Sequence, residues 1–508
     1  MSQISVNNLT FGYEGSVDSV FENVSFSIDT NWKLGFIGRN GKGKTTFLNL
    51  LLGKYHHEGS ITAATKFDYF PYGIAEHQKE MTVADFMEEL KPGCELWRVI
   101  CELEELSESP EILYRPYCTL SPGERTKALL AILFSEENEF LLIDEPTNHL
   151  DGDARECVKS YLASKKGFIL VSHDRDLLDA CTDHCLVLNR CSIEVQNGNF
   201  SAWWENKQRK DKFAMAENEK HQKEIRKLNK AAKQVSEWAD KNERTKIGFD
   251  PIKEHDRCLS TRSFIGAKTK KMQSRVKQME KRIDREIEEK EGLLQDIETP
   301  LDLKLFPFSH HKKRLINIKE YSLQYKNSNK PVFEGLSFEI ESGDRVVVSG
   351  KNGSGKTTLI RIILQKCNIN TGHADIEEAG LCEVASGLIV SCVGQETTGL
   401  KGNIADYCKE HNLDMSLFCT ILRQLDLERE QLAKNIENYS EGQKKKVLLA
   451  TSLLTPAHLY IWDEPLNYID VFSRMQLEQL ILKYQPTMLF VEHDRSFCEK
   501  IATKVILL

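Results

Sequence analysis

The sequence contains no cysteine pattern typical of a metal or redox site, although 14 of its 508 residues are cysteine. No two cysteines form a Cys-x-x-Cys pair, and Cys181, Cys185 and Cys191 are four and six positions apart. This spacing is typical of reduced core residues or of incidental thiols.

Long apolar runs are also missing. No uninterrupted apolar stretch approaches the ~18 residues of a membrane span, and no basic segment followed by an apolar stretch occupies the N-terminus. We therefore expect a protein that does not cross a bilayer and that resides in the cytoplasm.

Positive charge is not in excess over the whole chain. Lys and Arg number 68 against 76 Asp and Glu, and this net charge of -8 argues against a uniformly basic nucleic-acid binder. Residues 205–298, however, hold 25 basic and 19 acidic side chains, a local charge of +6 that leaves -14 on the remainder. A basic insert between two acidic domains suggests that the insert binds phosphate groups. The alternative is that the charges form the solvated face of a helix.

Two glycine-rich segments, 38–45 and 350–357, follow the P-loop pattern G-x-x-x-x-G-K-[ST]. Their lysines, Lys44 and Lys356, lie 312 positions apart. In such a loop the backbone amides surround phosphate oxygens, the lysine adds a positive charge, and the threonine hydroxyl binds Mg²⁺. Each copy therefore predicts a site for a nucleotide phosphate chain.

The flanking residues provide the context that a P-loop requires. Residues 32–37 and 344–349 predict short apolar strands before the loops, and residues 46–52 and 358–364 predict helices after them. A glycine turn that only joins a strand to a helix is the alternative. The expected nucleotide-binding residues are Gly38, Asn40, Gly41, Gly43, Lys44, Thr45 and Thr46 in the first copy and Gly350, Asn352, Gly353, Gly355, Lys356, Thr357 and Thr358 in the second.

Three further segments recur in the second half of the chain, at an offset of 319 or 320 positions. They are 119–125 with 438–444, 140–146 with 459–465, and 171–175 with 491–495. Such constant spacing predicts two copies of one α/β domain, which we place at 1–204 and 300–508 with a linker at 205–299. Tyr13 and Tyr325, upstream of the P-loops, could stack on adenine, and an ordinary buried tyrosine is the alternative.

The ordered set of P-loop, Ser-x-Gly signature, apolar-Asp-Glu-Pro strand end and switch histidine resembles the ATP-binding cassette (ABC) family in both halves. The resemblance implies two tandem P-loop ABC ATPase domains that bind ATP and Mg²⁺ and pair head to tail within one monomer. It further implies Asp144 and Asp463 as Mg²⁺-binding residues, Glu145 and Glu464 as catalytic groups that polarise water, and His173 and His493 as contacts of the γ-phosphate.

In this family the signature of each cassette closes over the P-loop of the other. Site one would therefore combine residues 38–46, Asp144, Glu145 and His173 with Ser440, Gly442 and Gln443. Site two would combine residues 350–358, Asp463, Glu464 and His493 with Ser121, Gly123 and Glu124. The threonines Thr45 and Thr357 would share the metal with the aspartates.

The two sites are not expected to be equal. Gln395 matches the Mg²⁺-contacting glutamine of the family, whereas the first copy has Tyr72 at that place and lacks the amide. Pro122 stands where the family usually has glycine in the signature. We therefore expect unequal hydrolysis rates, unless water or a neighbour such as Gln78 replaces the missing amide.

The insert predicts two long helices. Apolar residues follow three–four spacing within 205–240 and within 268–298, which predicts an antiparallel hairpin with helices of roughly 45–55 Å. The loop near 241–267 has no such period and carries apolar residues among charges. A loop of this composition is usually either disordered or a probe.

Two fused cassettes with a basic helical hairpin between them resemble the ABC-F subfamily, and within it the antibiotic-resistance members of the Lsa type. The resemblance rests on residues 16–23, residues 465–468 and the long loop. It implies a factor that enters the tRNA exit site of the ribosome, contacts large-subunit rRNA and P-site tRNA, and protects against lincosamides, pleuromutilins and streptogramin A. The expected ribosome-contacting residues are Phe249, Ile252, Phe264, Lys268, Lys270 and Lys271.

Two other functions remain open. One is a housekeeping ABC-F translation factor without a drug phenotype, which differs from the first mainly in loop length. The other is the soluble ATPase module of a membrane transporter, which the basic helical spacer disfavours.

Overall fold

The computed structural model describes most of the chain outside the predicted linker. The described residues are 3–13, 19–39, 41–136, 139–148, 150–189, 191–244, 274, 277–279, 281–283, 285, 304–326, 330–369, 376–395, 397, 399–425, 427 and 429–508. Of the predicted site residues, Asn40, Phe249, Ile252, Phe264, Lys268, Lys270 and Lys271 lie outside this set.

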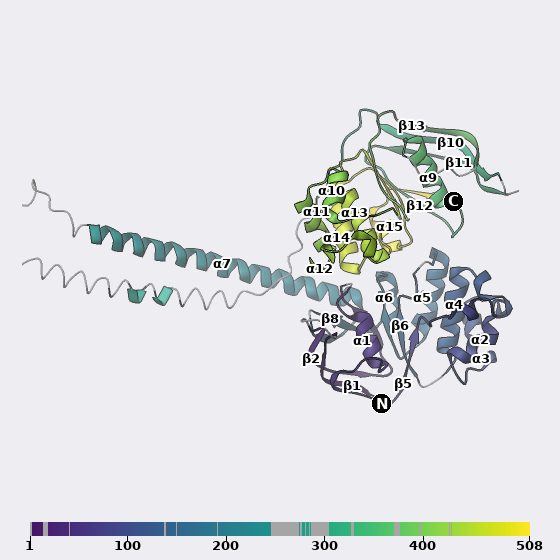
Figure 1. Ribbon diagram of the computed structural model, residues 1–508, viewed down its shortest axis with the longest axis horizontal. Coiled ribbons are helices and arrows are strands. Elements are labelled where there is room, and N and C mark those ends of the chain that lie inside the picture. Colours follow the sequence, from purple (N-terminus) through teal and green to yellow (C-terminus); the bar gives the residue numbers. More distant parts are fainter. Residues whose placement is uncertain are drawn as a thin grey trace, which may run out of the picture. The chain divides into compact units, whose positions relative to one another are not determined.

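The first half of the chain forms one α/β cassette, cassette 1, which has two sheets (Figure 1). An antiparallel sheet has the strand order β2-β1-β4, and a second sheet has the order β5-β6-β7-β3-β8-β9, parallel except for β9. The strands are β1 (Gln3–Phe11), β2 (Phe21–Asp29), β3 (Lys33–Ile37), β4 (Glu58–Ala63), β5 (Lys66–Phe70), β6 (Glu139–Asp144), β7 (Phe168–Val171), β8 (His184–Leu188) and β9 (Ile193–Asn197).

The helices of cassette 1 divide into two groups. In Figure 1, α2, α3 and α4 lie together on the side of the cassette away from α1. The helices are α1 (Lys44–Leu51), α2 (Val83–Leu90), α3 (Leu96–Glu105), α4 (Pro122–Phe134), α5 (Gly152–Ser164) and α6 (Arg175–Cys181), with short 3-10 turns at Glu76–Lys79, Pro110–Tyr114 and Tyr117–Thr119.

Aromatic packing fixes α1 in the core of cassette 1. The Phe47 ring of α1 lies 5.9 Å from Phe21 of the antiparallel sheet and 5.4 Å from Phe36 of the parallel sheet, measured between ring centroids. All three side chains are almost fully buried. Because α1 follows the first P-loop directly, this packing also fixes the loop.

Cassette 2 repeats this architecture in the second half of the chain. Its sheets have the strand orders β11-β10-β13 and β14-β15-β16-β12-β17, and the second is parallel throughout. The strands are β10 (Arg314–Tyr325), β11 (Pro331–Glu341), β12 (Arg345–Ser349), β13 (Ile376–Val384), β14 (Val390–Val393), β15 (Leu459–Asp463), β16 (Met488–Val491) and β17 (Lys504–Leu507). The helices are α9 (Lys356–Lys366), α10 (Ile404–Glu410), α11 (Met415–Gln424), α12 (Arg429–Leu432), α13 (Glu441–Leu454), α14 (Val471–Tyr484) and α15 (Arg495–Ile501), with a 3-10 turn at Ile436–Asn438.

The predicted fold class, two tandem ABC-type α/β domains, is confirmed. The strands predicted at 32–37 and 344–349 are β3 and β12, and the predicted helices are α1 and α9. Both helices begin two residues earlier than predicted, at the P-loop lysine. In both cassettes the carboxyl ends of the parallel strands meet at one edge of the sheet, which is where ligands bind in such folds.

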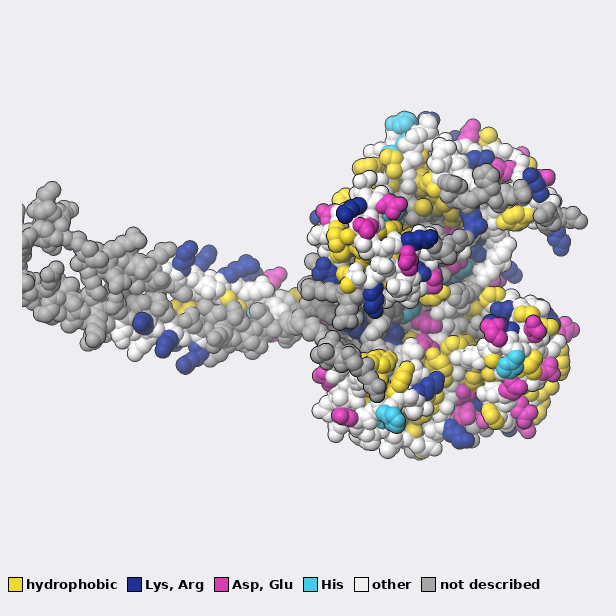
Figure 2. Space-filling view, viewed as in Figure 1, with side chains coloured by type: hydrophobic (Ala, Val, Ile, Leu, Met, Phe, Trp, Pro, Cys, Tyr) yellow, Lys and Arg dark blue, Asp and Glu magenta, His cyan; other side chains and the backbone are white. Residues whose placement is uncertain are grey.

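A single long helix, α7 (Phe200–Arg244), follows cassette 1. By its contacts the chain divides into two units, one of Met1–Trp203 with Pro300–Leu508 and one of Trp204–Thr299. Figure 2 shows lysine and arginine side chains along the described part of this helix. Among the helices that the structure describes, none has both the length and the apolar character needed to span a bilayer.

Candidate active sites

Each P-loop holds its lysine against the carbonyls of the loop itself. Lys44 Nζ donates to Gly38 O at 2.6 Å, and Lys356 Nζ donates to Gly350 O at 2.7 Å. Both lysines are buried, at 8% and 7% exposure. Burial lowers the pKa of Lys356, although nearby carboxylates oppose this effect. A phosphate oxygen entering the loop would meet a positive charge that is already in place.

Glycine is required where each P-loop enters its helix. Gly43 and Gly355 cap α1 and α9 in the left-handed conformation, with φ of 108° and 95°. A Cβ at these positions would lie 2.6 Å from Val20 Cγ1 and 2.4 Å from Val332 Cγ1. Backbone freedom and lack of space therefore both demand glycine, and the amides of the first turn remain exposed to a ligand.

The two upstream tyrosines lie beside the P-loop helices. The Tyr13 hydroxyl is 2.7 Å from Thr46 Oγ1, and the Tyr325 hydroxyl is 2.9 Å from Thr358 Oγ1. Their side chains are 45% and 39% exposed, so each ring keeps a free surface. This exposure fits a base-stacking residue better than the buried core tyrosine that was the alternative.

The predicted metal-binding pairs are assembled in both cassettes. Thr45 Oγ1 donates to Asp144 Oδ2 at 3.0 Å, and the Thr357 hydroxyl bonds Asp463 in the same way. Burial raises the pKa of Asp144, and it raises the pKa of Asp463 to about 6. A buried carboxylate with a raised pKa gains most from a cation, which fits a Mg²⁺ site.

The glutamates after these aspartates share an unusual backbone conformation. Glu145 and Glu464 have φ of 51° and 48°, and their amides donate to Val171 O and Val491 O of the adjacent strand. Each side chain thereby faces its switch histidine. His173 Nε2 lies 3.2 Å from Glu145 Oε1, and His493 Nε2 lies 3.7 Å from Glu464 Oε1.

The electrostatic states of the two glutamates differ. Burial, with the charge of Asp144, raises the pKa of Glu145. Burial acts in the same direction on Glu464, but the nearby His493 ring and a hydrogen bond from Asn467 outweigh it and lower the pKa of this carboxyl. The first glutamate therefore takes up a proton at higher pH than the second.

Strand register confirms that Tyr72 occupies the place of Gln395. Phe70 pairs with Ile143, and Val393 pairs with Trp462. Tyr72 follows Phe70 by two positions, and Gln395 follows Val393 by two positions. The Tyr72 hydroxyl donates to Asp68 Oδ2 at 2.5 Å and is occupied there.

The side chain of Gln78, the residue suggested as a substitute for the missing amide, also forms its hydrogen bonds elsewhere. Gln78 accepts from the amide of Ala75 and donates to Glu89 Oε2. The suggestion that Gln78 replaces the missing amide is therefore wrong. A residue that the sequence analysis missed reaches the site instead, because the Tyr69 hydroxyl donates to Asp144 Oδ2 at 3.3 Å.

The signature serines begin helices in both cassettes. Ser121 and Ser440 cap α4 and α13, and each forms a reciprocal capping box with Glu124 or Gln443. Pro122 occupies the first helical position, which tolerates proline because its amide needs no partner. Pro122, in place of the family's usual glycine, therefore does not disturb the start of α4.

The first signature lies next to the second P-loop. Ser121, Gly123 and Glu124 line a cavity of about 770 Å³ together with Lys351 and Asn352. The amide of Asn352 donates to Asp151 Oδ2 of cassette 1 at 3.4 Å. The structure thus brings together the predicted halves of site two. The pairing of Ser440, Gly442 and Gln443 with the first P-loop stays a prediction.

A second hollow contains further predicted residues of site two. Gln395, Glu464 and His493 line it together with Asn352. Three buried atoms at this site lack a hydrogen-bond partner within the described chain, namely Ser354 Oγ, Asp463 Oδ1 and His493 Nε2. Orphaned polar atoms are costly when buried, so this donor and acceptor set fits a nucleotide with Mg²⁺ and water.

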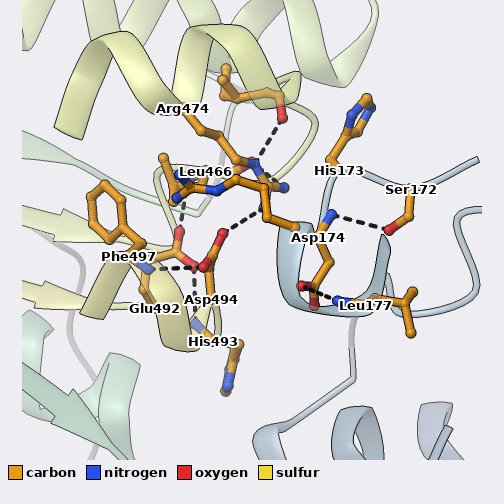
Figure 3. A network of polar contacts seen from close by, with 12 residues as sticks. Ser172, His173, Asp174, Leu177, Leu466, Arg474, Glu492, His493, Asp494 and Phe497 are labelled. Carbon is orange, nitrogen blue, oxygen red and sulfur yellow. Dashed lines mark hydrogen bonds and ion pairs between the residues drawn. The ribbon is translucent and has the colours of Figure 1, made fainter. Parts of the chain in front are cut away.

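Behind the switch histidines lies a network of buried charges that the sequence analysis missed (Figure 3). In cassette 2, Arg474 donates to Leu466 O, Ile469 O and Asp494 Oδ2 at 2.9–3.1 Å. Glu492 accepts from the amides of Leu466 and His493. The sequence signal was the exchange of Ser172 for Glu492 between the two copies.

Comparison with known proteins agrees with this geometry. The family model described as ABC transporter matches residues 21–148 and 333–467. These segments make up more than half of the chain and contain both P-loops, both signatures and both aspartate–glutamate pairs.

Three relatives illustrate the range of similarity. The chain is 28% identical over 497 residues to the ribosome protection protein VmlR of Bacillus subtilis (strain 168), covering 96% of this chain and 84% of that relative. It is 25% identical over 522 residues to the ATP-binding protein Uup of Caulobacter vibrioides, covering 96% and 74%. Among solved structures, the complex of archaeal ribosomal stalk protein aP1 with archaeal ribosome recycling factor aABCE1 matches with a TM-score of 0.60, at 16% identity, and covers 98% of this chain and 87% of that one.

The chain therefore belongs to the ABC transporter family, as an ATP-binding cassette protein of the ABC-F type. It binds and hydrolyses ATP. The match to the archaeal recycling factor shows the shared fold alone.

Proposed function

We propose that this protein is a ribosome-binding ATPase that protects the ribosome from antibiotics of the peptidyl-transferase centre. The drugs are lincosamides, pleuromutilins and streptogramin A. The protein acts from the tRNA exit site, where it contacts large-subunit rRNA and P-site tRNA. The observation that carries the proposal is the similarity to a relative named as a ribosome protection protein over 96% of this chain. The finer likeness to the Lsa group is part of the proposal.

The two ATP sites are composite in this proposal. Each binds ATP between the P-loop of one cassette and the signature of the other, and Tyr13 and Tyr325 stack on the adenines. Thr45 and Asp144 would hold Mg²⁺ in site one, and Thr357, Asp463 and Gln395 would hold it in site two. The metal supplies positive charge that offsets the charge of the phosphate oxygens.

The catalytic residues are Glu145 and Glu464, assisted by His173 and His493. Each glutamate orients the attacking water and accepts its proton, since it directly follows the metal-binding aspartate and faces the histidine. Each histidine contacts the γ-phosphate, and through this contact the loop that carries the histidine responds to the presence of the γ-phosphate. Both sites keep these residues, so both are competent for hydrolysis.

The linker makes the ribosome contact. Lysines and arginines follow the described part of α7, and RNA phosphates attract such a stripe. We assign residues 1–204 and 300–508 to the cassettes and 205–299 to the linker, with Phe249, Ile252 and Phe264 at a probing loop and Lys268, Lys270 and Lys271 on its flank.

Two measurements test this function together. With a non-hydrolysable ATP analogue the protein should pellet with ribosomes, and without nucleotide it should remain in the supernatant. Cells that carry the gene should tolerate higher concentrations of the three drug classes than cells that lack it. Pelleting without any change in susceptibility would contradict protection.

The second candidate is a housekeeping ABC-F factor. The similarity to Uup, an ATP-binding protein by name, favours this alternative at comparable coverage. Deleting residues 248–262 separates the two, because protection should be lost while ATPase activity and ribosome binding persist. Unchanged resistance after this deletion would favour the housekeeping function.

A further inference from the structure

The two switch histidines are held in different ways, and the difference lies in the residue before each of them. In cassette 1 the amide of His173 donates to Glu145 Oε2 at 3.4 Å. In cassette 2 the amide of His493 donates instead to Glu492 Oε2 at 2.9 Å. Glu145, the proposed catalytic residue, thus also anchors the loop that carries His173, the switch loop of cassette 1. Glu464 does not anchor the corresponding loop of cassette 2.

Glu492 joins two loops of cassette 2. Its second oxygen, Oε1, accepts from the amide of Leu466 at 2.8 Å. Leu466 belongs to the Asp-loop of cassette 2, residues 465–470, which follows Glu464. The Glu492 side chain is 7% exposed, so both hydrogen bonds are formed away from water and resist competition.

The Asp-loop in turn holds Glu464. Asn467 Nδ2 donates to Glu464 Oε2 at 2.7 Å. Glu492 therefore connects the loop that orients the glutamate with the loop that carries the histidine. In Figure 3 the His493 ring points away from Arg474. The ring lies beside Glu464, while the backbone amide of His493 is anchored by Glu492.

A buried arginine compensates the charge of this bridge. Arg474 binds Leu466 O and Asp494 Oδ2, and Asp494 Oδ1 caps α15 through the amide of Phe497. Cassette 1 keeps the arginine, since Arg155 donates to Leu150 O of its own Asp-loop. It lacks the bridge, because Ser172 Oγ accepts from the amide of Asp174 within the switch loop.

We propose that Glu492 is a positioning residue of site two, which sets Glu464 and His493 relative to each other and leaves the Glu464 carboxylate free for water. The inference rests on the proposed roles of Glu464 and His493. Without Glu492, the amide of His493 would turn to Glu464, as its counterpart does in cassette 1. Site two would then hydrolyse more slowly while binding ATP nearly as well.

The test uses variants in which a single site hydrolyses. Full-length Glu145→Gln protein reports site two, and Glu464→Gln protein reports site one. Adding Glu492→Ser, the residue type of cassette 1, should lower kcat of site two about tenfold or more, with KM for ATP changed less than about threefold. Adding Glu492→Gln should give a smaller loss, because the amide keeps one acceptor. Both changes should leave site one within about twofold.

An exposed glutamate provides the matched control. Glu499 lies on α15 and pairs with Arg495, so Glu499→Ser should leave both sites within about twofold. Equal losses of both sites on Glu492→Ser and Glu492→Gln would mean a general structural role and would overturn the proposal, as would an unchanged kcat of site two. If Glu145→Gln and Glu464→Gln alone fail to reduce turnover, the catalytic assignment itself fails, which is a distinguishable result.

Discussion

At the scale of single residues, the two sites differ in the hydrogen-bond partners of the aspartates that we propose as Mg²⁺-binding residues. Asp144 accepts hydrogen bonds from both Thr45 and Tyr69. Tyr69 precedes Tyr72 by three positions and reaches the site from β5. A tyrosine hydroxyl thus contacts Asp144 in site one, where Tyr72 replaces the glutamine that site two has at Gln395.

Removing this hydroxyl should weaken the metal site of cassette 1. Tyr69→Phe deletes the hydrogen bond to Asp144, and the Mg²⁺ concentration for half-maximal turnover of site one should rise about threefold to tenfold. The measurement is a Mg²⁺ titration of ATPase activity in the Glu464→Gln background. Tyr72→Phe is the control, since its hydroxyl binds Asp68. Equal effects of the two variants would show that the Tyr69 contact has no role.

The pH dependence of the two sites should differ as well. Burial, with the charge of Asp144, raises the pKa of Glu145, whereas the nearby His493 ring and the hydrogen bond from Asn467 outweigh burial and lower the pKa of Glu464. A base with a raised pKa is protonated at higher pH, so kcat/KM of site one should fall first as the pH decreases. The profiles of Glu464→Gln and Glu145→Gln protein measure this difference. Superimposable profiles would contradict it.

At the scale of elements, the P-loop depends on a glycine that has no space for a side chain. Gly43→Ala would place a Cβ against Val20, whereas Gly41→Ala also falls at a positive φ but has open space around it. Both substitutions should introduce backbone strain, because alanine rarely adopts a positive φ, but only the first should add a clash, of about 1–3 kcal/mol. Thermal unfolding should therefore give a lower melting temperature for Gly43→Ala. Equal melting temperatures would mean that the clash is relieved.

The elements of the fold were predictable where the signal is local. Residues 32–37 predicted β3 because they form an apolar run before a glycine loop, and such a run stays buried in a parallel sheet. The role of Tyr69 was not predictable, because its contact depends on the register between β5 and β6. The bridge of Glu492 was also missed, since it joins loops 26 positions apart in the chain.

The linker should bind RNA through its positive charge. Neutralising Lys268, Lys270, Lys271 and Arg275 should weaken ribosome binding and reduce its salt dependence, because fewer counterions are released. Co-sedimentation over a range of salt concentrations measures both effects. ATPase turnover of the free protein is the control and should not change.

At the scale of the whole molecule, we propose that the two ATP sites act together and contribute unequally to hydrolysis. Site two combines Gln395 with the Glu492 bridge, whereas site one has neither. Glu464→Gln should therefore cost more of the total ATPase turnover than Glu145→Gln. Equal losses in steady-state assays would show that Tyr69 and solvent compensate fully in site one.

The central claim is that ATP binding holds the protein on the ribosome and that hydrolysis releases it. The most direct measurement is co-sedimentation of the Glu145→Gln, Glu464→Gln double variant with ribosomes in the presence of ATP, alongside its ATPase rate. The amide preserves the shape of each side chain but cannot accept the proton of water, so ATP should bind and hydrolysis should stop. We predict that the double variant pellets with ribosomes in ATP while the unaltered protein largely does not. Unchanged ATPase turnover, or a double variant that binds ATP yet remains in the supernatant, would contradict the account.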